Sequence, residues 1–250
     1  MRRQGIMALA LGAVLAVASP GPGARAQGLV ADSSRHLVAI TTGFVGTDVL
    51  LFGATEGRGD VVIVVRGPTR NEVTRRKGRH AGIWVNEAEV TFTNVPSYYW
   101  LAASKPVDKL LKPEALDRHG IGVEHLAFGT QARLGEKEID AFRQGLLRNK
   151  VREGLFTIRP RDIAFLGDRL FRATIYFPAN VPTGPYTVQV FLVRDGRVAG
   201  AQTVPLNIAK VGIGADVYNF AHDNSALYGI IAIVIALAAG LFAGVIFRKV

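Results

Sequence analysis

Five histidines and a few neighbouring carboxylates are the side chains with which this chain could do chemistry. His119, Glu124 and His125 could in principle share a metal, because imidazole and carboxylate groups are ligands that zinc accepts. Their spacings of five and six residues do not align them on one helix face, and no second pair completes a ligand set. The sequence therefore predicts no metal site and no bound cofactor.

Two further acidic residues, Glu87 and Glu89, could point from one face of a strand, as paired acids do in glycosidases. They are too close in sequence to flank a sugar from opposite sides, so charges at a solvated strand edge are expected. No serine lies in a Gly-x-Ser-x-Gly elbow, and the absence of cysteine excludes a thiolate nucleophile. These patterns predict no catalytic residues and favour a protein that is not an enzyme.

A basic cluster lies within "VTRRKGRHAGIWVN", residues 73–86. Its cations, Arg75, Arg76, Lys77 and Arg79, surround Gly78 between two strand-like runs, and this pattern predicts the solvated turn of a hairpin. The alternative is a rim that faces anionic lipid or an acidic partner domain. Trp84 is flanked by Ile83 and Val85, which favours a core or sheet-face position.

Both ends of the chain carry apolar segments, and these indicate the cellular compartment of the domain between them. Residues 1–26 have the basic start, apolar centre and small-residue exit of a signal peptide, with cleavage expected after Ala26. Residues 226–247 are apolar over the ~20 residues that a membrane-spanning helix needs. The tail, residues 248–250, contains Arg248 and Lys249 and is expected in the cytoplasm. The prediction is a single-pass inner-membrane protein whose main domain faces the periplasm.

The charge of the chain is smaller than its formal value of +10 suggests. Removing the leader and the tail takes away five basic residues and leaves 25 Lys and Arg against 20 Asp and Glu; the five are Arg2, Arg3, Arg25, Arg248 and Lys249. A moderate excess on an exported domain argues against nucleic acid as a partner. The bilayer itself is the partner that the sequence predicts directly.

The exported region, residues 27–209, is expected to be mainly β. Short strand-like runs separated by turns predict an antiparallel, immunoglobulin-like β-sandwich, in one unit or two. Val61 to Val65 has no polar face and is predicted to be a central strand covered on both sides. Phe171, Ala173, Ile175 and Phe177 alternate with polar residues, as in a half-buried strand.

Turn signals follow in the later strands. Asp195 and Gly196 suit the tight turn of a hairpin. Tyr186, after a turn at residues 182–185, is placed like the tyrosine corner of immunoglobulin-like sandwiches.

A small helical insertion is expected at about residues 106–153. Pro113 to His119 has proline at the helix start and Gly120 at its stop, and a second segment places Ile139, Phe142 and Leu146 on one side. The insertion is expected to pack on the sandwich. Residues 210–225 contain glycines and are predicted to be a juxtamembrane linker.

Small residues recur four apart in the predicted membrane helix: Ala232, Ala236, Gly240 and Gly244. This spacing stacks them along one ridge, where another helix could approach closely. Alanine and glycine are also common in such helices, so the ridge is either a packing face or a matter of composition.

Several blocks of the chain together resemble a known family. They are "SSRHLVAITTGFVGTDVLLFGATEGRGDVVIVVRGP", "RRKGRHAGIWVN", "VTFTNVPSYYWLAAS", "FRATIYFPANVPTGPYTVQVFLVRDG" and "VYNFAHDNSALYGIIAI". In this order they are similar to an alphaproteobacterial family of transmembrane proteins that is defined by sequence and has no assigned activity. The resemblance implies a periplasm-facing domain with one C-terminal anchor. It also implies a multispanning permease of the sulfite-exporter kind as a neighbour, and it supplies no site residues.

The leading hypothesis is a noncatalytic accessory subunit of a membrane transport system, docked on a multispanning permease through the small-residue ridge. One alternative is a membrane-anchored binding or sensor module that acts alone in the periplasm and uses the basic rim for anions. The weaker alternative is a periplasmic hydrolase whose site is assembled from distant residues.

Overall fold

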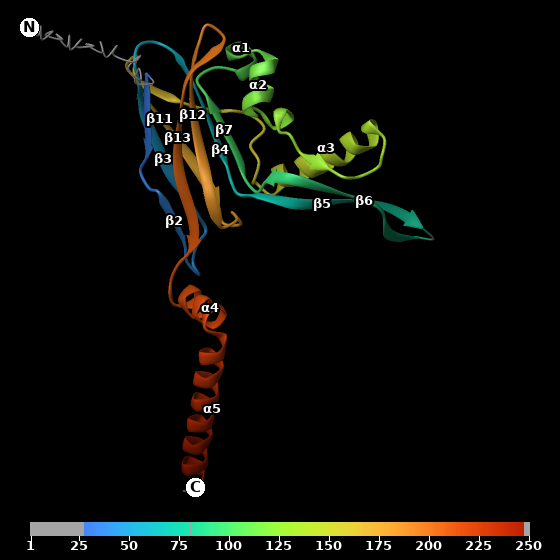
Figure 1. Ribbon diagram of the computed structural model, residues 1–250, viewed down its shortest axis with the longest axis vertical. Helices are drawn as coiled ribbons and strands as arrows, with labels where there is room; N and C mark the ends of the chain where they lie inside the picture. The colour runs from blue at the N-terminus through green and yellow to red at the C-terminus, as the bar shows by residue number, and fades with distance from the viewer. Residues whose placement is uncertain (1–27, 81, 248–250) are drawn as a thin grey trace, which may run out of the picture.

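The computed structural model describes residues 28–80 and 82–247. Figure 1 shows three parts: an upright body of strands, an arm that projects sideways from it, and a long helix that continues downward from the body. The predicted signal peptide, residues 1–26, and the predicted cytoplasmic tail, residues 248–250, lie outside the described residues. The chain is mainly β, as the sequence predicts.

The body consists of two sheets, named here sheet A and sheet B. Sheet A has the strand order β1–β3–β11–β10, and its strands span Leu29–Ser33, Gly46–Thr55, Leu170–Pro178 and Ala164–Leu166. Sheet B has the order β2–β13–β12–β4–β7–β9, and its strands span Leu37–Ile40, Arg197–Lys210, Gly184–Arg194, Asp60–Arg66, Tyr99–Ala103 and Arg161–Asp162. Neighbouring strands are antiparallel except for β2 with β13 and β7 with β9.

The core lies between these sheets. In β11 the buried residues alternate with exposed ones as predicted, and Phe177 contacts both Tyr98 and Tyr186, the latter on β12 of the opposite sheet. In β4 the whole run from Val61 to Val65 is buried, because the strand lies between β12 and β7 and is covered on both faces. Continuous apolar runs of this kind are typical of such central strands.

Two predicted turns of the later strands are confirmed. Asp195 and Gly196 join β12 to β13, and both have positive φ angles, 50° and 73°, which a two-residue hairpin turn of this type requires. The Tyr186 hydroxyl donates a hydrogen bond to the carbonyl of Pro182 at 2.6 Å, which is the contact of a tyrosine corner. The immunoglobulin-like relationship of the sandwich stays a prediction.

The arm is a long hairpin, β5 (Thr69–His80) with β6 (Ile83–Pro96), and the short strand β8 (Gly129–Thr130) pairs with its base. The sequence predicts that the strand-like runs here are interrupted by a turn around Gly78. Two strands form instead, because β-bulges near Arg70 and Arg76 let the pairing continue through the irregular positions. The hairpin leaves the body between β4 and β7, which are neighbours in sheet B.

The predicted helical insertion contains α1 (Val107–Leu110), α2 (Pro113–His119), a 3₁₀ turn (Val123–His125), β8 and α3 (Glu136–Arg152). Gly120 ends α2 in the left-handed conformation, as expected. Arg66 of β4 donates hydrogen bonds to the carbonyls of His119 and Gly120, and the Tyr99 hydroxyl donates to Gly120 at 3.0 Å. These bonds attach the end of α2 to sheet B and satisfy carbonyls that the helix leaves free.

The expectation that the whole insertion packs on the sandwich is wrong for α3. This helix lies along the arm and contacts β5 (Figure 1). Its apolar side supplies Phe142, Leu146 and Leu147, which are buried. A hairpin alone is marginally stable in water, so α3 gives the arm the second layer that it needs.

The predicted juxtamembrane linker, residues 210–225, is largely helical: β13 continues to Lys210 and α4 spans Ile213–Asp223. The glycines that suggest a flexible linker lie before and in the first turn of this helix, at Gly212 and Gly214. The final helix, α5 (Ser225–Phe247), contains a 20-residue segment, Ser225–Gly244, that is long and apolar enough to cross a membrane, and none of it is buried against the body.

Candidate functional site

The basic cluster lies within β5 and not in a turn, which corrects the sequence prediction. Gly78 pairs with Val85 in the ladder, and the chain reverses beyond His80, where Gly82 has φ +87°. The carboxylate of Glu87 lies over Gly78, where a Cβ would collide with it unless this flexible side chain moved. That carboxylate lies 2.7 Å from Nε2 of His80. The glycine that resembles a turn signal therefore lies in a strand, beneath a cross-strand pair.

The contacts of α3 show which way the side chains of β5 point. Glu72 Oε1 lies 2.6 Å from Nζ of Lys150 on α3, and Thr74 lies under Gly145 of the same helix. Arg76 continues the series, with its guanidinium 3.2 Å from Glu138 and over the ring of Phe142 at 5.5 Å. Side chains alternate across a strand, so the even positions of β5 face α3.

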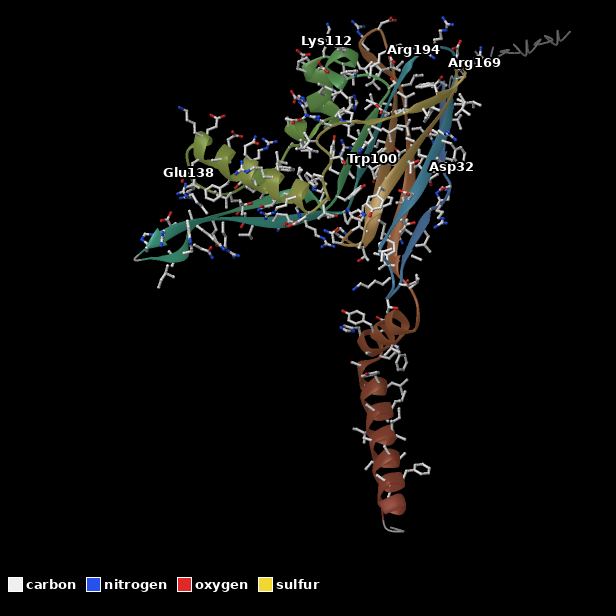
Figure 2. The ribbon with its side chains drawn as sticks, turned by 180° about the vertical axis from the view of Figure 1, so that it is seen from behind. Asp32, Trp100, Lys112, Glu138, Arg169 and Arg194 are labelled. Atoms are coloured by element: carbon white, nitrogen blue, oxygen red, sulfur yellow. The ribbon has the colours of Figure 1, made fainter. Side chains whose placement is uncertain are left out.

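The odd positions of β5 consequently form the opposite face of the arm, named here the outer arm face. It comprises Val73, Arg75, Lys77 and Arg79 of β5 with Trp84 of β6, which pairs with Arg79. Figures 1 and 2 show α3 on one side of the arm while α5 extends in the other direction. The outer arm face is thus turned toward the side of the molecule on which α5 lies.

The four cations of the predicted rim do not all lie on one face of the arm. Arg76 is used by Glu138 and Phe142 on the α3 side. Arg75 pairs with Glu89 across the hairpin at 3.0 Å. Lys77 and Arg79 are exposed and form no ion pair with any described residue. The two cations of the cluster that have no ion pair therefore lie near the tip of the arm.

Of the two positions expected for Trp84, core or sheet face, the structure has the second: Trp84 is 65 % exposed and lies on a sheet face that nothing in the described chain covers. Its neighbours Ile83 and Val85 are also exposed, at 68 % and 41 %. Tryptophan and arginine are among the residue types that are enriched at the energetic centres of protein interfaces. The arm tip combines exposed apolar side chains with two unpaired cations. The sequence did not predict this surface, because an apolar run from Ile83 to Val85 looks the same whether or not another element covers it.

The two carboxylates considered for glycosidase chemistry are engaged in pairs. Glu87 contacts His80 and Glu89 contacts Arg75, each across the hairpin ladder. Both pairs lie on the exposed hairpin of the arm. The prediction that they are strand-edge charges agrees with this geometry.

The histidines considered for a metal are not brought together. His125 Nδ1 lies 2.6 Å from the carboxylate of Asp117, and the ring of His119 lies 5.1 Å from that of Phe191. Partial burial, aided by Arg118 and Arg66, lowers the pKa of His119, which favours the neutral ring. Within residues 28–80 and 82–247, no group of three or more His, Asp or Glu side chains could hold a metal ion.

The continuous helix α5 contains the four residues of the predicted small-residue ridge. Ala232, Ala236, Gly240 and Gly244 are all exposed, and a Cβ added at Gly240 or Gly244 would have no neighbour within 4 Å. No described part of the chain covers this face. It is open to lipid or to a helix of another molecule.

Two comparisons with known proteins bear on these features. No curated protein matches the chain. A family model described as "Putative transmembrane protein (Alph_Pro_TM)" matches residues 28–249, which includes the body, the arm and α5. The match covers nearly all of the sequence that follows the predicted signal peptide. The chain therefore belongs to this transmembrane protein family.

Proposed function

We propose that this protein is a noncatalytic accessory subunit of a membrane transport system. In this proposal α5 anchors the chain in the inner membrane, with residues 248–250 in the cytoplasm and the sandwich and arm in the periplasm. Its partner is a multispanning permease, of the sulfite-exporter kind that the family resemblance implies. The subunit binds the permease at two places, within the membrane and above it.

The arm is the observation that carries the proposal. It runs across the direction of α5 and leaves the body above α4, so its tip lies over bilayer that a neighbouring membrane protein would occupy (Figure 1). The tip presents Lys77, Arg79 and Trp84 without partners in the described chain. Such a surface suits an acidic, partly apolar periplasmic surface on the permease.

The ridge of α5 supports contact within the membrane. Small residues four apart allow helix backbones to approach closely, and van der Waals packing then drives association in lipid. A chain with one membrane helix and an exposed small-residue face can pack against a helix of the permease. The arm and the ridge would together fix the orientation of the subunit relative to the permease.

Purification of the full chain in a mild detergent tests the proposal. The wild type is expected to retain a multispanning protein, and the double variant Ala236→Leu/Gly240→Leu is expected to lose it, because leucine keeps the backbones apart. Ala238→Leu is a matched control, since it makes the same change about 200° away around the helix. Loss of the partner in the control as well, or its retention in the double variant, would contradict docking through the ridge.

A second candidate is a membrane-anchored module that binds an anion alone, and the two unpaired cations at the arm tip favour it. Calorimetry on the purified full chain with sulfite or sulfate tests this function. Saturable binding that is lost in Lys77→Gln/Arg79→Gln and retained in Arg197→Gln would support it. If calorimetry gave no heat of binding and the detergent purification recovered the permease, the results would favour the accessory function over the anion-binding module.

A further inference from the structure

The outer face of sheet A carries a continuous apolar patch that the sandwich does not use. Large apolar side chains point outward from all four strands of this sheet: Val30, Leu50, Phe52, Leu166, Leu170 and Tyr176. Phe52 is 45 % exposed and Val30 is 69 % exposed. Single exposed apolar residues are ordinary, whereas a contiguous patch on a folded domain marks an interaction surface. No described part of the chain lies over it.

The register of the strands arranges the patch in rows. The strand β3 lies between β1 and β11. One row consists of Val30, Ala54 and Leu170, and the next consists of Asp32, Phe52 and Arg172. The second row therefore has an acid on one side of Phe52 and a base on the other. Both charged side chains are exposed. Asp32 Oδ1 accepts a hydrogen bond from the backbone N–H of Ser33 at 2.7 Å and lies 3.3 Å from Nε2 of His36, which is itself exposed, so no Lys or Arg of the described chain pairs with it.

This row is complementary to itself. When two copies of a sheet meet face to face, a two-fold axis along the central strand leaves that strand facing its own copy and exchanges the strands on either side. Such an axis along β3 places Phe52 opposite Phe52 of the second copy. It also places Asp32 opposite Arg172 twice, and Val30 opposite Leu170. A two-fold axis perpendicular to the strands would instead place each side strand opposite itself.

The membrane anchor sets an independent condition on the same axis. Two copies in one bilayer must both direct α5 into it, so their two-fold axis must run along the membrane normal. Figure 2 shows the strands of sheet A running in roughly the same direction as α5. The axis along β3 therefore meets the condition, while the perpendicular in-plane axis would direct the two α5 helices to opposite sides.

We propose that the outer face of sheet A binds the same face of a second copy of this chain, forming a two-fold symmetric dimer in the membrane. Phe52 lies at its centre, and Asp32 and Arg172 form reciprocal ion pairs beside it. The dimer goes beyond the proposed accessory function, because it uses neither the arm nor the ridge of α5.

Charge reversal in the full chain tests the dimer, with the dissociation constant measured in detergent across a range of protein concentrations. Asp32→Arg and Arg172→Asp each create two like-charge contacts, so each is expected to raise the dissociation constant about tenfold or more. The double reversal restores opposite charges and is expected to return the constant to near the wild-type value. Arg197→Asp, an exposed reversal on sheet B, is the matched control and is expected to leave it unchanged.

Phe52→Arg tests the apolar centre of the dimer and is expected to give a monomer; circular dichroism confirms that each variant is folded. A wild type that stays monomeric at every concentration would overturn the proposal, as would a double reversal that does not restore the dimer. A dimer that survives Phe52→Arg but is lost in Ala236→Leu/Gly240→Leu would arise from α5, and it too would overturn the proposal.

Discussion

Lys150 is the residue that joins α3 to the arm most directly. Its side chain is only 10 % exposed, and its ammonium group lies 2.6 Å from the carboxylate of Glu72, which is 26 % exposed. A nearly buried ammonium needs this partner, because removing one member of such a pair leaves the other charged and desolvated. Arg76 adds a more exposed pair with Glu138 farther along the same strand. The position of α3 on the arm thus depends on a few named contacts.

The two members of the pair are expected to respond differently to mutation. Glu72→Gln leaves Lys150 charged and nearly buried, and should lower the free energy of unfolding by about 2 to 3 kcal/mol. Lys150→Met should cost less, because Glu72 is closer to solvent and the methionine can pack in place of the lysine stem. Urea unfolding of the full chain in detergent measures both values. Equal losses in the two variants would contradict the assignment of Lys150 as the buried partner.

Three buried tyrosines should make the free energy of unfolding fall as the pH becomes alkaline. Burial raises the pKa of Tyr99 and of Tyr186 from 10.0 to about 12, and it also raises the pKa of Tyr98. Between pH 10 and pH 12 the unfolded chain loses these protons while the folded chain keeps them, so stability should fall as pH rises through this range. Tyr186→Phe should reduce that fall, measured as the difference in unfolding free energy between about pH 8 and about pH 11. If this difference were the same in Tyr186→Phe as in the wild type, the prediction would be contradicted.

The arm is an element that could be removed without disturbing the sandwich. It leaves sheet B between neighbouring strands, and beyond Arg76 its strands pair only with each other. Replacing residues 77–87 with Asn-Gly would close a shorter hairpin with a favoured turn. Stability is expected to change by less than about 1 kcal/mol, because the removed side chains are mostly exposed.

The proposed partner, in contrast, should be lost from the purified complex of this shortened variant. Comparison of recovered partner per mole of subunit, with the Ala238→Leu variant as a folded reference, measures the effect. Full recovery would show that the arm tip is not part of the binding surface, while the role of the α5 ridge would still be tested separately by its own variants.

Many of the strands, turns and helices can be predicted from the sequence where a single residue pattern dominates a segment. The run Val61 to Val65, the alternation in β11, the Asp195 turn and the capped helix α2 each carry an unambiguous local signal, and each is found. The arm was not predictable in its true form, since Gly78 has the appearance of a turn but lies within a strand, where it pairs with Val85. The exposure of Trp84 likewise depends on its position on the face of the hairpin opposite α3, which no described element covers. A local residue pattern does not show which distant elements pair with a segment or cover it.

At the scale of the whole molecule, the absence of cysteine from the chain provides a direct test of orientation. A single cysteine at Val45, which is 82 % exposed on the body, is expected to react with a membrane-impermeant maleimide in cells whose outer membrane has been opened. A cysteine placed at Val250 should react only after the inner membrane is dissolved. Labelling of both positions from the same side would contradict a periplasmic body with a cytoplasmic end.

The transverse direction of the arm has a consequence for valency. A half-turn about an axis parallel to α5 reverses any direction that lies across it, so a symmetric pair of chains would extend its two arms in opposite directions (Figure 1). Each pair could then engage two neighbouring molecules at once, and the first engagement would raise the effective concentration for the second. A pair of chains in which one arm is shortened would lose this avidity but would still bind one neighbouring molecule through the intact arm.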